Sequence, residues 1–322
     1  MKVDAKVLSQ IAKGIEKSLG EGKLRKIKDT EFQSTGIKAI DWALGGGCPI
    51  GQMTEVFGEF STGKTLLGEH LIAETQKAGG IGIFIDSERR FSAAMANAVD
   101  IDTEALLYLC PSCLEQVYTY IETIAKEVRS QFDGLIALVW DSLGGTQAKD
   151  EMEGEVTLRK MRGLRAHVNS VGLAKIIPLV DDLGVAFYVT NQLRDRPDVM
   201  YGKTWYTMGG NAPEFYSTVQ VWLKKGKKIQ VDTEGNRVEG SKKKGKVIGL
   251  AGSLEVVKNS VSPPFREVEF ETFYDRGIPH LSGWLDCLVE QGEVKQGGGW
   301  YEYKGEKFRS KDFEKMWEEK DG

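Results

Sequence analysis

The stretch from Gln52 to Thr65, QMTEVFGEFSTGKT, constrains the fold of this chain more than any other. Met53–Phe57 is typical of a buried strand, and the residues after it match the phosphate-loop pattern G-x-x-x-x-G-K-[ST]. Leu67 and Leu71, one turn apart, then predict a helix. The residues of the pattern are Gly58, Glu59, Phe60, Ser61, Thr62, Gly63, Lys64 and Thr65. Strand, glycine loop and helix in this order predict an α/β domain that binds a nucleoside triphosphate.

Each residue type in this loop has a physical reason. Gly58 and Gly63 let the backbone curl so that several N–H groups point at one anion. The helix that begins near Lys64 adds the positive end of its dipole. The Lys64 ammonium can reach the β- and γ-phosphates, and the Thr65 hydroxyl can hold Mg²⁺. This context favours a phosphate site over a glycine loop that only turns a corner.

Bulk properties set the class of protein. The chain has 322 residues, 41% hydrophobic and 28% charged, which suits one large α/β domain with small additions. A net charge of −4 does not by itself indicate nucleic-acid binding, although a local basic groove can exist on an acidic protein. No apolar run approaches the roughly 18 residues of a membrane span. The first residues, MKVDAKVLSQ, lack a signal-peptide core, so we expect a cytoplasmic protein without membrane contact.

Apolar strands alternate with helical patterns after the loop. Near-continuous apolar strands separated by helices indicate a parallel sheet covered on both faces. From about residue 219 the strands are joined by Gly- and Lys-rich turns, and the last of them, 266–273, alternates apolar and acidic residues like a half-exposed antiparallel strand. Pro178 predicts a kink or break in its helix. The expected strands are 81–86, 106–110, 135–140, 185–190, 219–223, 229–231, 254–258 and 266–273, and the expected helices include 114–128 and 164–183.

Three domains are predicted. Residues 1–32 hold an amphipathic helix and a basic linker, 33–277 form the main domain, and 278–322 form a small C-terminal domain. The apolar stripe of the first helix has to be buried, and the pattern leaves open whether its own core or a neighbouring subunit covers it. Ser34-Thr35 is expected to cap the next helix, which ends at the glycines 45–47.

Cys110 and Cys113 form a C-x-x-C pair that could be redox-active. A zinc site would need a second such pair, which the sequence does not contain. We favour a structural interpretation, in which Cys110 ends a buried strand and Cys113 begins the next helix.

Polar residues follow three of the predicted strands. Asp141 ends the strand 135–140 and can hold the Mg²⁺ shell through water. Glu88 lies just past the strand 81–86, where it could take a proton from an attacking water. Gln192 follows the strand 185–190 and could contact the γ-phosphate. These positions predict hydrolysis rather than binding alone.

Two irregular stretches are candidates for nucleic-acid contact. Residues 151–165 hold several basic side chains around Met161, which could grip phosphates and wedge between bases; a solvated basic helix start is the alternative. Residues 193–206 have almost no helical or strand period and lead into Gly209-Gly210-Asn211. Because Gln192 directly precedes this second stretch, a side chain that contacts the γ-phosphate would be joined to a mobile loop.

Taken together, these segments resemble the RecA-type DNA strand-exchange recombinases of bacteria or bacteriophages. The resemblance covers about residues 7–308. It implies a RecA-like P-loop ATPase core with a mostly parallel central sheet, an antiparallel extension, an N-terminal helix and a small C-terminal α+β domain. It also implies an ATP- and Mg²⁺-dependent helical filament of this chain on single-stranded DNA that pairs with double-stranded DNA. The matching segments are STGIKAIDWALGGG, GEFSTGKT, FIDSE, EMEGE, NQLR, GGNAPEFY, VVKNSVSPPF and GWYEYKGEK.

The resemblance also implies residue roles. Glu88 is expected to be the catalytic carboxylate, Gln192 the γ-phosphate sensor, and Tyr274 a neighbour of the adenine across a subunit interface. Lys258 is expected to contact the neighbouring subunit's γ-phosphate, and the N-terminal helix is expected to dock on the adjacent subunit. The implied DNA-binding residues are Arg159, Lys160, Met161, Arg162, Gly163, Arg165, Arg194, Arg196, Val199, Trp205, Gly209, Gly210 and Asn211.

Several positions depart from the family pattern. Ser92 and Met95 occupy the positions of acidic and tyrosine side chains that contact adenine. Trp205 replaces a small polar residue and could stack on bases. Ser260 stands where a second lysine is usual, so Lys258 would act alone and turnover would be slow. The competing functions are a hexameric helicase or translocase on the same core and a non-enzymatic recombinase regulator.

Overall fold

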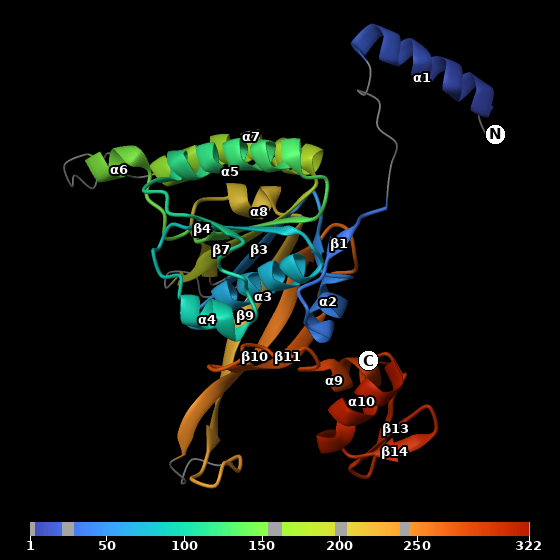
Figure 1. Ribbon diagram of the computed structural model, residues 1–322. Helices are drawn as coiled ribbons and strands as arrows, with labels where there is room; N and C mark the ends of the chain where they lie inside the picture. Colours follow the sequence, from blue (N-terminus) through green and yellow to red (C-terminus); the bar gives the residue numbers. More distant parts are fainter. Residues whose placement is uncertain (1–3, 21–28, 154–162, 197–204, 239–244, 322) are drawn as a thin grey trace. The chain divides into compact units, whose positions relative to one another are not determined.

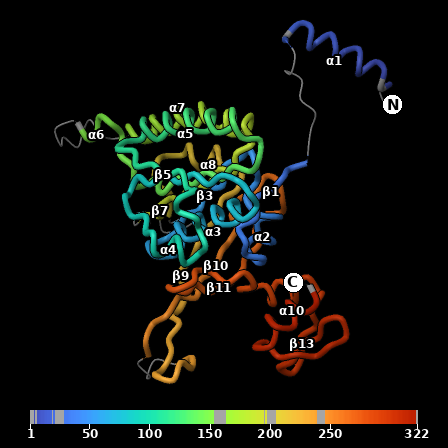
Figure 2. The backbone as a smooth tube through the Cα atoms, viewed as in Figure 1, coloured from blue at the N-terminus to red at the C-terminus, as the bar shows by residue number. Residues whose placement is uncertain are grey.

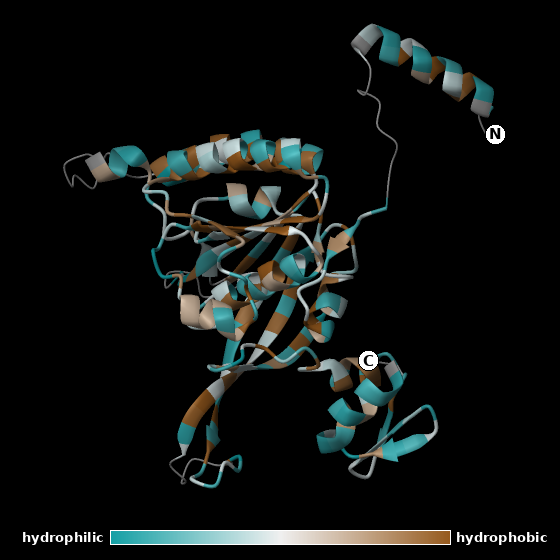
Figure 3. Cartoon of the chain, in the orientation of Figure 1, coloured by the Kyte–Doolittle hydropathy of each residue, from teal (hydrophilic) through white to brown (hydrophobic). Residues whose placement is uncertain are grey.

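The computed structural model describes residues 4–20, 29–153, 163–196, 205–238 and 245–321, and the chain divides into two units, residues 1–31 and 32–322. Helix α1 (Ala5–Leu19) makes up the first unit. The Asp4 side chain accepts a hydrogen bond from the Lys6 amide and so caps this helix. Within their own unit Val7, Leu8 and Ile11 are exposed, and Figure 3 shows apolar and polar residues on different sides of α1.

The second unit is built on a nine-stranded sheet in the order β11-β10-β9-β3-β7-β6-β4-β5, with β8 paired to β7 (Figure 1). Strands β4, β6, β7, β3 and β9 run parallel, whereas β9, β10 and β11 pair antiparallel, as predicted. The strands are β3 (Met53–Gly58), β4 (Ile81–Asp86), β5 (Leu106–Leu109), β6 (Ile136–Asp141), β7 (Val185–Asp195), β8 (Trp205–Thr207), β9 (Val219–Val231), β10 (Lys246–Asn259) and β11 (Glu267–Phe273).

Helices cover both faces of this sheet (Figure 2). Successive strand side chains point to opposite faces, so Phe84 joins one hydrophobic core while Ile83 and Ile85 join the other. The first core is covered by α2 (Lys38–Leu44), α3 (Lys64–Lys77) and α4 (Ala93–Ala98), and the second by α5 (Leu114–Gln131), α7 (Leu164–Leu183) and α8 (Ala212–Tyr216). The short helix α6 (Lys149–Glu153) follows β6 along the chain.

The last part of the chain has its own small core. It contains α9 (Trp284–Glu290), the antiparallel strands β12 (Lys295–Gly297), β13 (Trp300–Tyr303) and β14 (Glu306–Phe308), a 3₁₀ turn (Ser310–Asp312) and α10 (Phe313–Asp321). Leu288, Tyr303 and Trp317 are buried together there. Two short strands, β1 (Phe32–Gln33) and β2 (Cys48–Pro49), form a separate pair. In the part of the chain described, no helix combines the length and apolarity needed to cross a membrane.

Some local predictions were wrong. Ser34 and Thr35 do not cap α2, because their hydroxyls donate to the Asp41 carboxylate at 2.6 and 2.7 Å, and the N-cap position falls on Ile37. Helix α7 runs through Pro178, so of the predicted kink or break the break does not occur.

The predicted strands 219–223 and 229–231 are one strand, β9, whose pairing with β10 absorbs irregularities as register shifts. Strand β5 is half-exposed because it lies at the sheet edge, so Cys110 is exposed rather than buried. Cys113 is buried at the start of α5, as predicted, and both thiols are free.

The two described ends of the stretch 193–206 are also more regular than predicted. Strand β7 continues to Asp195 and pairs antiparallel with β8, with Leu193 opposite Thr207 and Arg194 opposite Tyr206. The Trp205 ring packs 4.9 Å from that of Phe57 and 5.2 Å from that of Trp222, between centroids. Trp205 therefore joins an aromatic cluster of the sheet, while Tyr206 is exposed beneath the Arg196 guanidinium.

This packing gives a stability prediction. Aromatic pairs add about 0.5–1.5 kcal/mol beyond the apolar area that they bury, so Trp205→Ala should lower the free energy of unfolding by about 1–3 kcal/mol without DNA. Tyr206→Ala, the matched control on the same strand, should change it by less than about 0.5 kcal/mol. Urea denaturation of the DNA-free proteins measures both. Equal stability of the Trp205→Ala and wild-type proteins would contradict the packing role.

Candidate nucleotide site

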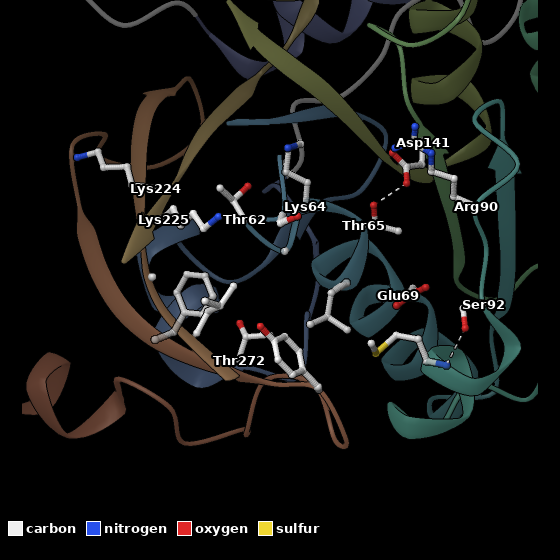
Figure 4. Close-up of a pocket in the computed structure, with 18 of the residues that line it drawn as sticks. Thr62, Lys64, Thr65, Glu69, Arg90, Ser92, Asp141, Lys224, Lys225 and Thr272 are labelled. Atoms are coloured by element: carbon white, nitrogen blue, oxygen red, sulfur yellow. Dashed lines mark hydrogen bonds between the residues drawn. The ribbon is translucent and has the colours of Figure 1, made fainter. Parts of the chain in front are cut away.

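The predicted site residues meet at the carboxyl ends of the parallel strands. Gly58 at the end of β3 pairs with Gln192 on β7, and Asp86 at the end of β4 pairs with Asp141 on β6. A cavity of about 460 Å³ opens there (Figure 4). Its lining includes the loop residues Ser61 to Thr65 together with Leu66, Glu69, Glu88, Arg90, Ser92, Met95, Asp141, Lys224, Lys225, Leu250, Phe270, Thr272 and Tyr274.

The phosphate loop has the backbone shape of an anion cradle. Ser61 and Gly63 have φ values of 57° and 91°, in the left-handed region, which turns successive N–H groups inward. A Cβ on Gly58 would lie 2.3 Å from the Leu223 carbonyl oxygen, so only glycine fits there. The Lys64 ammonium donates to the carbonyl oxygens of Gly58 (3.0 Å) and Glu59 (2.5 Å) at the mouth of the loop. Burial lowers the pKa of Lys64, although nearby Asp141 opposes this shift. The cradle therefore fits a triphosphate.

Thr65 and Asp141 form an oxygen-rich pair beside the loop. The Thr65 hydroxyl donates to Asp141 Oδ2 at 2.6 Å, shown as a dashed line in Figure 4, and the Thr190 hydroxyl donates to Oδ1 at 2.5 Å. Burial raises the pKa of Asp141, and these two hydrogen bonds act in the opposite direction. Hydroxyl and carboxylate oxygens are the ligands that Mg²⁺ prefers, so the pair fits this ion.

The structure brings Glu88 and Gln192 together. Glu88 Oε1 accepts hydrogen bonds from Ser142 Oγ (2.5 Å) and Gln192 Nε2 (3.1 Å), and its Oε2 lies 3.1 Å from Arg90 Nη1. The Glu88 side chain is 16% exposed, so a water can still reach it. No role was predicted for Ser142 from the sequence, although this residue directly follows Asp141 at the end of a strand.

A chain of hydrogen bonds leads from Gln192 into the β7–β8 pair. Arg194 Nη2 donates to Gln192 Oε1 at 3.2 Å. The Asn191 side chain donates to buried Glu55 Oε1 (2.7 Å) and to the Met208 carbonyl (2.9 Å), which holds the return of the chain from β8. A movement of the Gln192 side chain would therefore act directly on Arg194 and on the β7–β8 pair that follows. No role was predicted from the sequence for Asn191 or Glu55.

The predicted DNA-binding residues are partly described. Arg159, Lys160, Met161, Arg162 and Val199 lie outside the described residues. Of the others, Arg194, Arg196, Gly163, Gly210 and Asn211 are exposed. Arg165 forms an ion pair with Glu151 at 2.6 Å, and the Gly209 carbonyl accepts a hydrogen bond from Asn169 at 3.1 Å.

Tyr274 lines the cavity and is about half exposed. Lys258 does not line it: its ammonium donates to the carbonyls of Glu214 (2.8 Å) and Phe215 (3.4 Å) at the end of α8. Burial lowers the pKa of Lys258. Within one chain Lys258 is therefore not brought to the phosphate loop. Two lysines on β9, Lys224 and Lys225, do line the cavity and were missed, because strand lysines usually mark only a solvated face.

Comparisons with known proteins agree with this geometry. The family model of the RecA N-terminal domain matches residues 6–279. "Protein RecA" of Chloroherpeton thalassium is 36% identical over 308 residues, covering 94% of this chain and 81% of the relative. The proteins of the same name from Trichodesmium erythraeum (94% of this chain, 81% of the relative) and Rubrobacter xylanophilus (93% and 83%) are 34% and 35% identical. With its phosphate loop, strand order and strand-end carboxylates, the chain belongs to the RecA family.

Proposed function

We propose that this protein is an ATP-dependent recombinase that forms a helical filament on single-stranded DNA, pairs it with homologous double-stranded DNA and exchanges strands. The contact that carries the proposal is Gln192, hydrogen-bonded both to Glu88 in the nucleotide cavity and to Arg194 on the exposed β7–β8 pair. Nucleotide state and DNA contact would be coupled through this one side chain. DNA-stimulated ATP hydrolysis follows from the same coupling.

Each cavity residue has a separate task in this proposal. The backbone N–H groups from Glu59 to Thr65 and the Lys64 ammonium bind the phosphates. Thr65 and Asp141 would hold Mg²⁺, which neutralises phosphate charge when bound. Glu88 orients a water and accepts its proton. Gln192 reports the presence of the γ-phosphate, and Tyr274 lies beside the base.

The DNA contacts are proposed for two segments, 151–165 and 193–209. Exposed Arg194 and Arg196 supply positive charge on an otherwise acidic chain. Such contacts release counterions, so affinity for single strands should fall as salt rises. Tyr206, exposed beside Arg196, offers a ring for base stacking, in place of the Trp205 ring that packs on the sheet.

A filament requires surfaces that another copy covers. In α1 Val7, Leu8 and Ile11 are exposed within their unit, and the Phe215 side chain beside Lys258 is 77% exposed. We propose residues 1–32 as the polymerisation segment, 33–277 as the ATPase core and 278–322 as an accessory domain. A cytoplasmic location goes with this assignment.

Glu88→Gln separates nucleotide binding from hydrolysis. The variant keeps the shape of the side chain but removes the base, so hydrolysis should fall by about 10²–10⁴ while filaments form with ATP and persist. Electron microscopy with ATP and single-stranded DNA gives the readout, and Lys64→Ala, which should form none, is the control. Closed rings would instead indicate a hexameric helicase, and DNA binding without ATP turnover in the wild type would indicate a regulator.

Lys258→Ala tests the contact between subunits. If Lys258 leaves the end of α8 to reach the neighbour's γ-phosphate, the variant should lose DNA-stimulated hydrolysis, because even about 1.4 kcal/mol of transition-state stabilisation is tenfold in rate. Ser260→Lys, which adds the second cation, should raise turnover. Stimulated ATPase assays measure both. Normal stimulation in Lys258→Ala would show that Lys258 only caps α8.

A further inference from the structure

Glu69 is a buried carboxyl in the nucleotide cavity that the catalytic scheme does not use. It lies on α3 one turn after Thr65, and therefore on the same helix face. The residue is only 3% exposed, and its Oε2 is buried with no hydrogen-bond partner among the described residues. Buried polar atoms normally have partners, and an orphaned one costs free energy. This oxygen therefore points to a ligand group that donates a hydrogen bond.

Its place in the cavity indicates which part of the ligand it meets. Figure 4 shows Glu69 farther along α3 from Lys64 than Thr65 is, and both Glu69 and Ser92 line the cavity. Five residues of α-helix advance about 7.5 Å, a distance that carries Glu69 beyond the phosphates bound at the start of α3. Outside the phosphate loop, the cavity is lined by apolar and aromatic side chains that suit the flat ring of a nucleotide base. They are Leu66, Met95, Leu250, Phe270 and Tyr274.

Glu69 does not belong to a cluster of three or more His, Cys, Asp or Glu side chains that could hold an ion, since the part of the chain that the structure describes contains no such cluster. Burial raises the pKa of Glu69 to about 8, and the Asp141 charge adds to the shift. A protonated carboxyl offers one acceptor and one O–H donor. Adenine presents the complementary pair, its N6 amino group beside a ring nitrogen.

We propose that Glu69 is a specificity residue whose carboxyl hydrogen-bonds to the exocyclic amino group of the adenine base of the bound nucleotide. Because Ser92 and Met95 replace the family's usual adenine contacts, another residue that lines the cavity has to select the base. The inference rests on the proposed ATP-dependent function and adds to it the residue that selects the base.

The test compares ATP with purine riboside 5′-triphosphate, which lacks the amino group. Titration calorimetry on the wild type should show about tenfold tighter binding of ATP, or about 1.4 kcal/mol. Glu69→Leu should lose about tenfold in ATP affinity and leave that of the analogue unchanged. Glu69→Gln keeps an acceptor and a donor and should retain the preference. Glu74→Leu, the same substitution on the same helix outside the cavity lining, should behave like wild type.

A second measurement guards against a folding defect. Removing an orphaned buried oxygen should raise the melting temperature of the nucleotide-free Glu69→Leu protein by about 2–4 °C. An equal loss of affinity for both nucleotides, or a wild type that does not distinguish them, would overturn the role of Glu69 while leaving ATP binding intact. If the wild type bound neither nucleotide, or if Lys64→Ala bound ATP as tightly as the wild type, the result would contradict the proposed ATP-dependent function itself and not only the role of Glu69.

Discussion

The site depends on the hydrogen-bond register of four parallel strands. The phosphate loop follows β3, Glu88 follows β4, Asp141 ends β6, and Gln192 lies on β7. These residues are far apart in sequence and meet only because Gly58 pairs with Gln192 and Asp86 with Asp141. A slip of one residue would turn every side chain of a strand to the other face. Two cores, one on each face, fix the register because each needs its own alternate set of apolar side chains.

Polar groups behind the site are largely satisfied by one another. One oxygen of Asp141 accepts a hydrogen bond from Thr65 and the other accepts one from Thr190. These two hydrogen bonds join the start of α3 to β7. Glu55 is fully buried, and burial raises its pKa, yet it accepts hydrogen bonds from Asn191 and Gln220. Networks of this kind hold the strand ends rigidly, so that the side chains around the cavity need little rearrangement. Against this background the unpartnered oxygen of Glu69 is an exception.

Much of this arrangement could be predicted from the sequence, for physical reasons. Central strands are buried on both faces, so near-continuous apolar runs predicted β4, β6 and β7. Strand β3 was predicted from Val56 and Phe57 and from its place directly before the phosphate loop, which its motif identifies. Contacts between distant segments leave no local signal. The hydrogen bonds of Asn191 with Glu55 and of Ser142 with Glu88 join residues that only tertiary packing brings together. Likewise Glu69 in a helical pattern looks like any surface carboxylate.

The β7–β8 pair has an entropic consequence for ligand binding. The irregular stretch expected at 193–206 has fourteen residues, and the pair fixes five of them, 193–195 and 205–206. Ordering the backbone of one residue costs about 1–2 kcal/mol, so folding has already met about 5–10 kcal/mol of the ordering cost of this stretch. A ligand that contacts the β7–β8 pair therefore spends less of its contact energy on ordering these five residues.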